Sequence, residues 1–224
     1  GARVGIGFDG DADRIGLVDE NGQMVAGDDL LVVLSRSILK TKPGAEIIGD
    51  VKCSDRLYAD IKLNGGKPIM WKTGHSLIKN KIKEIKSPFG GELSGHVFFA
   101  DRNYGYDDAL YAALRVVEIL STTSGGFSTL LAGYPPAFNT PEIRIDTTEE
   151  KKWSIVERLK TAYANRSDLK MNLIDGIRIS FPDGWALARA SNTQPVLVLR
   201  FESNTKAGLA RIQTEVEAIV NPLL

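Results

Sequence analysis

The sequence has few features that would link it to an oxidising compartment or to a membrane. Its 224 residues include one cysteine, so no internal disulfide can form, and Cys53 is most simply a small buried apolar residue. The longest apolar runs, such as residues 30–34, are far too short to span a bilayer. No signal peptide precedes Gly1. Together these absences predict a cytoplasmic location.

The chain also has no net charge, because its 28 basic and 28 acidic side chains cancel. A protein without an overall field does not attract nucleic acid or an anionic membrane, so we expect neither as a partner. Any anion must then be bound by a local site. Apolar residues make up 43% and charged residues 25%, which is typical of a soluble globular protein. The sequence contains no internal repeat and no low-complexity tract.

The first residues, RVGIGF at positions 3–8, predict a buried strand that begins almost at once. A chain rarely opens on a core strand without a neighbour to pair with. We therefore interpret Gly1 as a cut within a domain. In the rest of this first block, residues 1–40, the Asn-Gly pair at 21–22 predicts a hairpin between strands at 15–18 and 23–26. Asp28 or Asp29 is expected to cap a helix that runs through Leu39.

The second block, residues 41–136, alternates strands with helices, which indicates a layered α/β domain. The expected strands are 47–51, 67–71 and 91–99, and the expected helices are 54–63, 75–85 and 106–120. The last helix carries Leu110, Leu114, Val117 and Leu120 on one face.

The third block, residues 137–224, predicts an α+β domain with antiparallel hairpins between two flanking helices. Strands are expected at 142–145, 173–181, 185–190 and 196–203, with helices at 149–164 and 206–220. The expected fold is thus multi-domain α/β: a partial α/β domain, a complete α/β domain and a C-terminal α+β domain with an antiparallel sheet.

The clearest chemical signal is DGDADR at positions 9–14. Asp9, Asp11 and Asp13 can surround one small hard cation, and oxygen-only ligands favour Mg²⁺ or Ca²⁺. An EF-hand is the obvious rival, but Arg14 replaces the glycine that its loop requires at the sixth position. Without a cation, three carboxylates beside two core strands would raise one another's pKa values.

A second motif, GGELSGH at positions 90–96, brings Glu92, Ser94 and His96 to the same side of an extended segment. An acceptor, a hydroxyl and a proton-transfer group on one face suit a polyhydroxylated sugar. A third motif, RASNTQP at positions 189–195, offers Arg189, hydroxyls and backbone N–H groups in a tight loop, which predicts a phosphate site.

Two lysines follow predicted strand ends, where α/β sheets place ligand groups. Lys52 ends the run GDVK, and Lys72 lies in WKTGHS, where Ser76 is a further candidate helix cap. Either lysine could instead be solvated surface.

In this order the motifs resemble those of the α-D-phosphohexomutase family, and the similarity runs from Val4 to the C-terminus. The sequences GELSGH and RASNT are most similar to its phosphomannomutase/phosphoglucomutase branch, whereas phosphoglucosamine mutases more typically show GEQSGH. The resemblance implies that residues 1–40 are the end of the family's second domain, 41–136 its third and 137–224 its fourth. Residues 138–141 would be the hinge of that mobile fourth domain.

The resemblance also implies a role for each motif residue. Asp9, Asp11 and Asp13 would hold Mg²⁺, and Arg14 would steady the phosphoryl group. Lys52 and His96 are the implied acid–base candidates. The implied substrate-binding residues are Thr73, Gly74, His75, Glu92, Ser94, Arg189, Ser191, Asn192 and Thr193.

The implied reaction interconverts hexose 6-phosphate and hexose 1-phosphate through a phosphoserine and a 1,6-bisphosphate, with glucose or mannose 1,6-bisphosphate as activator. The chain departs from the family because it contains no Thr-Ala-Ser-His-type nucleophile loop, so we expect these residues alone to be inactive. The alternatives are a phosphoglucosamine mutase, a non-catalytic sugar-phosphate-binding module and a metal-dependent phosphatase with Asp9 as nucleophile.

Overall fold

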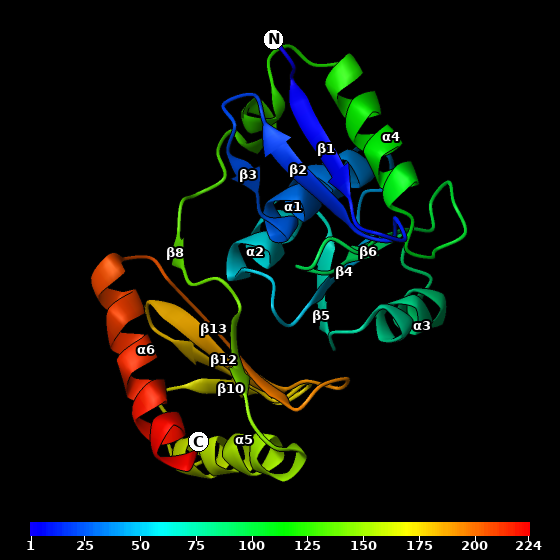
Figure 1. Ribbon diagram of the computed structural model, residues 1–224. Helices are drawn as coiled ribbons and strands as arrows, with labels where there is room; N and C mark the ends of the chain where they lie inside the picture. The colour runs from blue at the N-terminus through cyan, green and yellow to red at the C-terminus, as the bar shows by residue number, and fades with distance from the viewer. The chain divides into compact units, whose positions relative to one another are not determined.

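The computed structural model describes residues 1–224 and divides them into two compact units, Gly1–Pro135 and Pro136–Leu224. Figure 1 shows the elements of each unit. None of the helices is both long enough and apolar enough to cross a bilayer. Residues 1–40 belong to the same compact unit as residues 41–135.

The first unit begins with a small antiparallel sheet in the order β1-β2-β3, formed by β1 (Val4–Phe8), β2 (Ile15–Asp19) and β3 (Met24–Val25). The predicted hairpin at Asn21-Gly22 is confirmed. The Asp19 carboxylate accepts the backbone N–H groups of Asn21 and Gln23, and Gly22 takes a φ of 78° that suits glycine. The prediction that the first strand is buried is wrong for this chain, since Phe8 is 43% exposed.

The second sheet of this unit has the order β5-β4-β6-β7. Its strands are β4 (Glu46–Asp50), β5 (Lys67–Trp71), β6 (Phe89–Gly91) and β7 (Val97–Phe99), and the helices around it are α1 (Gly27–Thr41), α2 (Asp55–Leu63), α3 (His75–Ile85) and α4 (Ala109–Ser121). The strand β4 is parallel to β5 and β6, whereas β7 is antiparallel to β6. A 3-10 helix, η1 (Phe127–Leu131), follows α4.

Successive residues of the strands point to opposite faces of this sheet, and the helices cover both. Ile47 and Phe99 belong to a large core that includes residues of α1, α2 and α4. Their neighbours Ile48 and Phe98 pack instead with Ile78 and Ile82 of α3. The unit is therefore the layered α/β structure that the alternation of strands and helices predicts.

Three further local predictions for this unit are wrong. Neither Asp28 nor Asp29 caps α1, because both lie inside its first turn, and the buried Asp28 carboxylate accepts the Ser54 N–H instead. Residues 91–99 are not one extended segment but the end of β6, a turn and β7. The apolar face assigned to α4 is also largely exposed.

On α4 the side chains of Leu110, Leu114 and Val117 are 57%, 66% and 49% exposed. The helix packs on the core through Ala109, Ala112, Ala113, Val116 and Leu120. Small side chains let the helix approach the strands closely, so Ala112 and Ala113 face inward whereas Leu110 and Leu114 do not.

The second unit is built on one six-stranded antiparallel sheet. It comprises β8 (Phe138–Asn139), β9 (Ile143–Asp146), β10 (Lys170–Asn172), β11 (Ile177–Phe181), β12 (Gly184–Ala190) and β13 (Val196–Ser203), with α5 (Glu149–Tyr163), α6 (Lys206–Val220) and η2 (Asn221–Leu223). Residues of α5 and α6 share one core with β11, β12 and β13. The predicted pattern of hairpins between two helices is confirmed.

The segment that was expected to be a hinge, residues 138–141, is hydrogen-bonded into this sheet. Phe138 and Asn139 pair with Ser203 and Glu202 of β13, and the Thr140 N–H donates to the Phe201 carbonyl at 3.0 Å. The compact units instead divide between Pro135 and Pro136.

Candidate functional site

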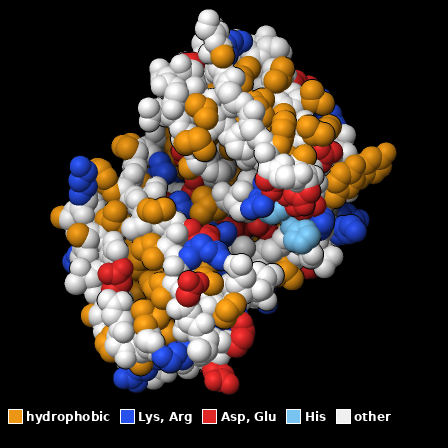
Figure 2. All heavy atoms as spheres, in the orientation of Figure 1, with side chains coloured by type: hydrophobic (Ala, Val, Ile, Leu, Met, Phe, Trp, Pro, Cys, Tyr) orange, Lys and Arg blue, Asp and Glu red, His pale blue; other side chains and the backbone are white.

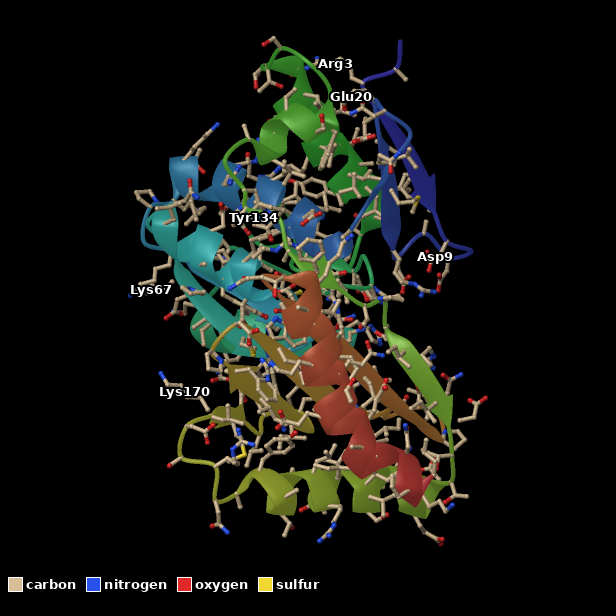
Figure 3. The ribbon with its side chains drawn as sticks, turned by 90° about the vertical axis from the view of Figure 1, so that its left-hand side faces the viewer. Arg3, Asp9, Glu20, Lys67, Tyr134 and Lys170 are labelled. Carbon is tan, nitrogen blue, oxygen red and sulfur yellow. The ribbon has the colours of Figure 1, made fainter.

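The acidic loop connects β1 to β2, and Figure 3 labels Asp9, its first residue. Asp9 holds the two ends of the loop together through hydrogen bonds. Its carboxylate accepts the Arg14 backbone N–H at 3.1 Å and the Arg14 guanidinium, and its carbonyl accepts the Ala12 N–H at 3.2 Å. Ala12 has a φ of 58°, a conformation that costs free energy for any residue with a side chain. The loop is thus held in a strained turn that points its carboxylates to one place.

The three carboxylates of the loop converge. One oxygen from each of Asp9, Asp11 and Asp13 lies within 4.8 Å of the others. Burial raises the pKa of Asp13 above its ordinary value, and the charges of Asp11 and Asp9 raise it further, against the opposing effect of His96. The buried Oδ1 of Asp13 has no hydrogen-bond partner. A clustered set of oxygens with one left unsatisfied fits a hard cation such as Mg²⁺.

Asp9 differs electrostatically from Asp13. Burial acts to raise its pKa, but the hydrogen bonds and charge of Arg14 outweigh this and hold the pKa of Asp9 below its ordinary value. Arg14 therefore keeps one carboxylate of the loop ionised, which is the form that binds a cation.

The acidic loop is joined directly to the turn between β6 and β7. The Ile15 N–H donates to the Gly95 carbonyl at 3.1 Å, and Arg14 and His96 form an isolated antiparallel bridge. Gly95 has a φ of 96°, and a Cβ there would lie 2.5 Å from the Ile15 carbonyl oxygen. Only glycine permits this contact. The acidic loop and the turn, although distant in the sequence, are therefore in direct contact.

The turn itself runs from Glu92 to His96. The Glu92 N–H donates to the His96 carbonyl at 2.9 Å, and the Gly95 N–H donates to the Glu92 carbonyl at 3.1 Å. The predicted extended face therefore does not exist, although Ser94 still lies against Glu92, to which its hydroxyl donates at 3.1 Å. The other Glu92 oxygen accepts the Gly74 N–H at 2.8 Å. This bond brings the KTGHS loop to the same turn.

Glu92 is 3% exposed. Burial, and then the nearby charge of Asp50, raise its pKa to about 7, against the hydrogen bonds of Gly74 and Ser94 and the charge of Lys52. A carboxyl group with this pKa changes its protonation state in the physiological range.

Lys52 and Thr73 meet at Asp50, the last residue of β4. Asp50 is fully buried, accepts the Thr73 hydroxyl at 3.0 Å and lies 3.8 Å from the Lys52 ammonium group. It also accepts the Leu93 N–H at 3.3 Å, so it links the strand end to the turn at Glu92. Sequence reasoning names Lys52 but not Asp50, although the place of Asp50 at the end of a predicted strand is a usable signal.

The two histidines of the chain stack beside the acidic loop. The ring centroids of His75 and His96 are 5.8 Å apart, and Figure 2 shows the histidines next to acidic side chains. His96 Nδ1 lies 3.7 Å from Asp13 and 3.5 Å from Asp107. Burial lowers the pKa of His96, against the nearby charges of Asp13 and Asp107.

Asp107 is a site residue that sequence reasoning missed. Its carboxylate lies 3.1 Å from His75 Nδ1 and accepts the Lys79 ammonium group at 3.0 Å. Burial acts to raise its pKa, but the hydrogen bond and charge of Lys79 hold the pKa of Asp107 below its ordinary value. Nothing in the sequence separates Asp107 from Asp108, which caps α4.

The RASNTQP motif lies in the second unit, in the turn between β12 and β13. Arg189 is 5% exposed, and its Nε donates to Asp175 at 3.0 Å. The Ser191 N–H donates to the Val196 carbonyl at 2.9 Å and closes the turn, while the Thr193 N–H donates to the Ser191 hydroxyl at 3.4 Å. The motif is therefore a structured hairpin turn with a buried guanidinium at its base.

The predicted site residues fall into two groups. The first unit brings together the acidic loop, Lys52, the KTGHS loop and the turn at Glu92–His96. The second unit holds Arg189, Ser191, Asn192 and Thr193. The first group offers a candidate cation site beside candidate hydroxyl-binding and proton-transfer groups, and the second offers candidate donors for an anion.

Two family models match the chain. Residues 26–138 match phosphoglucomutase/phosphomannomutase, alpha/beta/alpha domain III, and residues 142–219 match phosphoglucomutase/phosphomannomutase, C-terminal domain. Together they cover most of both compact units.

Named relatives agree with the family models. The chain is 49% identical to a Pseudomonas putida phosphomannomutase/phosphoglucomutase over 95% of its own length and 46% of that protein. It is 43% identical to a Neisseria gonorrhoeae phosphoglucomutase over 100% of its length and 49% of that protein. The chain thus spans about half the length of these curated relatives.

A solved structure shows the same fold. The chain superposes on a phosphoglucomutase/phosphomannomutase family protein from Burkholderia thailandensis with a TM-score of 0.89 and 44% identity. The match covers 99% of this chain and 47% of the other.

Proposed function

Because the chain belongs to the phosphoglucomutase/phosphomannomutase family, we propose that it supplies the metal, sugar and phosphate loops of a phosphohexomutase. The reaction interconverts hexose 6-phosphate and hexose 1-phosphate through a phosphoserine and a hexose 1,6-bisphosphate. The proposed substrates are glucose and mannose phosphates, as the names of the relatives indicate.

One observation carries this proposal, namely the direct connection between the acidic loop and the turn at Glu92–His96. The Ile15–Gly95 hydrogen bond places the carboxylate cluster next to the groups proposed to bind the sugar. Phosphoryl transfer depends mainly on positioning and on charge neutralisation. A cation site fixed beside a hydroxyl-binding turn provides both.

Asp9, Asp11 and Asp13 would hold Mg²⁺, which when bound would supply positive charge against the phosphoryl oxygens. Arg14, which keeps Asp9 ionised through its Nε, would steady the same phosphoryl group with the other nitrogens of its guanidinium. About half of the Arg14 side chain is exposed, so a ligand can reach it.

Glu92 and Ser94 would bind sugar hydroxyl groups, and Thr73, Gly74 and His75 would line the same side. His96 would accept the proton of the hydroxyl that receives the phosphoryl group, because burial lowers its pKa and favours the neutral imidazole. Lys52 is the second candidate for this proton transfer, since it is 6% exposed and lies near Glu92 and Asp50.

Arg189, Ser191, Asn192 and Thr193 would bind the phosphate group that is not reacting. Binding energy at this remote phosphate would help to orient the reacting end of the sugar. We further propose that residues 1–224 alone do not turn over, because no Thr-Ala-Ser-His-type serine loop is present among them.

The test is an assay of the intact gene product that contains this chain. With Mg²⁺ and glucose 1,6-bisphosphate, it should convert glucose 1-phosphate and mannose 1-phosphate into the 6-phosphates. Asp11→Asn should abolish this conversion, whereas Asp183→Asn, which removes a partly exposed carboxylate paired with Arg211 in the second unit, should leave it unchanged.

Each rival function gives a different result. A non-catalytic module would bind hexose phosphates without converting them, and Asp11→Asn would not change that binding. A phosphatase would release inorganic phosphate without needing the bisphosphate. A preference for glucosamine phosphate over both other sugars would indicate a phosphoglucosamine mutase.

A further inference from the structure

The phosphate loop, residues 189–194, accepts hydrogen bonds from Lys152, a residue that belongs to none of the sequence motifs. Lys152 lies in the first turn of α5 and is 2% exposed. Thr148 caps this helix by accepting the Lys151 N–H, and the Thr147 N–H donates to the Pro195 carbonyl at 2.9 Å. The start of α5 is therefore fixed beside the end of the loop. Lysine is almost never this buried unless its charge is paired.

The ammonium group of Lys152 has three donors, and three acceptors surround it. It donates to the Ser191 carbonyl at 2.8 Å, to the Gln194 carbonyl at 2.9 Å and to the Glu149 carboxylate at 2.8 Å. The Glu149 side chain is 66% exposed, so this carboxylate connects the buried charge to solvent. The other two donors join the beginning and the end of the phosphate loop.

The direction of these two carbonyls sets the direction of the neighbouring N–H groups. In a trans peptide the C=O and the following N–H point in opposite directions, and this chain has no cis peptide bond. With the Ser191 carbonyl turned toward Lys152, the Asn192 N–H must point away from it. Gln194 is followed by Pro195, which has no N–H, so its carbonyl can face Lys152 without turning a donor away from the ligand side.

We propose that Lys152 is a positioning residue, which holds both ends of the phosphate loop and so directs the loop's backbone donors toward a bound phosphate. It does not touch the phosphate itself. The inference rests on the function proposed above for residues 189–194. The positive charge of Lys152 contributes little to anion binding directly, because Glu149 offsets it.

The chain contains a matched control on the same helix. Lys160 forms the same kind of pair with Glu157, three residues before it at 2.8 Å, as Lys152 does with Glu149. Lys160 is partly exposed and donates to no loop carbonyl. Lys160→Met therefore removes an equivalent charge and ion pair without changing the phosphate loop.

The experiment compares the 224-residue chain with Lys152→Met, Lys152→Arg and Lys160→Met. Two quantities are measured: the dissociation constant for inorganic phosphate, and amide hydrogen exchange in residues 191–196 relative to β11. Lys152→Met should weaken phosphate binding roughly tenfold or more and speed exchange in the loop by a similar factor, since a hydrogen bond to a charged group contributes at that level. Lys152→Arg should restore most of both effects, and Lys160→Met should change neither.

Unchanged phosphate binding and unchanged loop exchange in Lys152→Met would overturn the inference. Equal loss of protection in the loop and in β11 would also overturn it, because Lys152 would then support the whole unit and not the loop. A parent chain that binds no phosphate would count against the proposed function of the loop. Amide exchange would still decide the role of Lys152 in that case.

Discussion

Glu92→Gln should stabilise the first unit at high pH and have little effect at low pH. The substitution removes a charge and keeps both hydrogen bonds. Its amide oxygen can accept the Gly74 N–H, and its amide NH₂ can donate to the Ser94 hydroxyl, which rotates to accept. The difference between parent and variant therefore measures what it costs to ionise a buried carboxyl group.

The magnitude follows from the pKa. Folding raises the pKa of Glu92 from 4.5 to about 7. At about 1.4 kcal/mol for each pKa unit, the ionised form costs about 3 kcal/mol on folding. A group with a raised pKa contributes stability that is fully present below pH 4.5 and is lost as the pH rises to about 7. The advantage of Glu92→Gln should therefore grow from near zero at pH 4.5 to about 3 kcal/mol at pH 8.

The assay is native-state hydrogen exchange of peptides from residues 46–99, which reports on the first unit by itself. Parent and variant are compared at each pH, so that the intrinsic pH dependence of exchange cancels. Glu84→Gln serves as the control, since this carboxylate on α3 is 63% exposed, and it should shift stability by less than about 0.5 kcal/mol at any pH. An advantage of Glu92→Gln that is equal at pH 5 and pH 8 would refute the reasoning.

Three further predictions concern the loops. In the active protein, Arg189→Ala should raise KM and lower kcat, with a loss of about 1.5–3 kcal/mol in phosphate binding; unchanged steady-state kinetics would place this loop outside the site. Gly95→Ala should cost more than about 1 kcal/mol in thermal unfolding, because its Cβ would lie 2.5 Å from the Ile15 carbonyl, and an unchanged melting temperature would contradict the contact. The 224-residue chain should bind Mg²⁺ only weakly, since three aspartates leave the ion short of oxygen ligands, and submicromolar binding by calorimetry would be the contrary result.

Much of the secondary structure could be predicted because the apolar pattern of a segment and the turn or cap residues beside it indicate the same boundaries. The bounds expected for β5, α3 and α6 coincide with the structure. The helices α3 and α6 have apolar residues at helical spacing, β5 is a short apolar run, and each of the three has a glycine, proline or hydroxyl residue close to its start. Where those signals conflict, the prediction was wrong.

The helix α4 is such a case. It is apolar on more than one face, so periodicity alone cannot say which face is buried. The larger residues Leu110 and Leu114 suggested a core face, but Ala112, Ala113 and Val116 pack inward. Close approach between a helix and a sheet depends on the neighbouring elements, which a local pattern does not contain.

The candidate site shows the same limit. The motifs identified side chains with recognisable chemistry, including the aspartates of the acidic loop and His96. They could not identify Asp107 or Lys152, whose contacts are with residues distant in the sequence. Lys152 donates to two backbone carbonyls about forty residues away, and no spacing of residues in the sequence indicates such a contact.

The hydrogen bond between Ile15 and Gly95 has a consequence for how this protein can diverge. The acidic loop and the turn at Glu92–His96 share a backbone contact, so a substitution in either loop alters the geometry available to the other. Their effects on fitness should therefore be non-additive, as is usual for residues in direct contact. A change of sugar preference that begins in the turn would be tolerated only in some acidic-loop backgrounds, and the order in which substitutions arise would decide which variants are reachable.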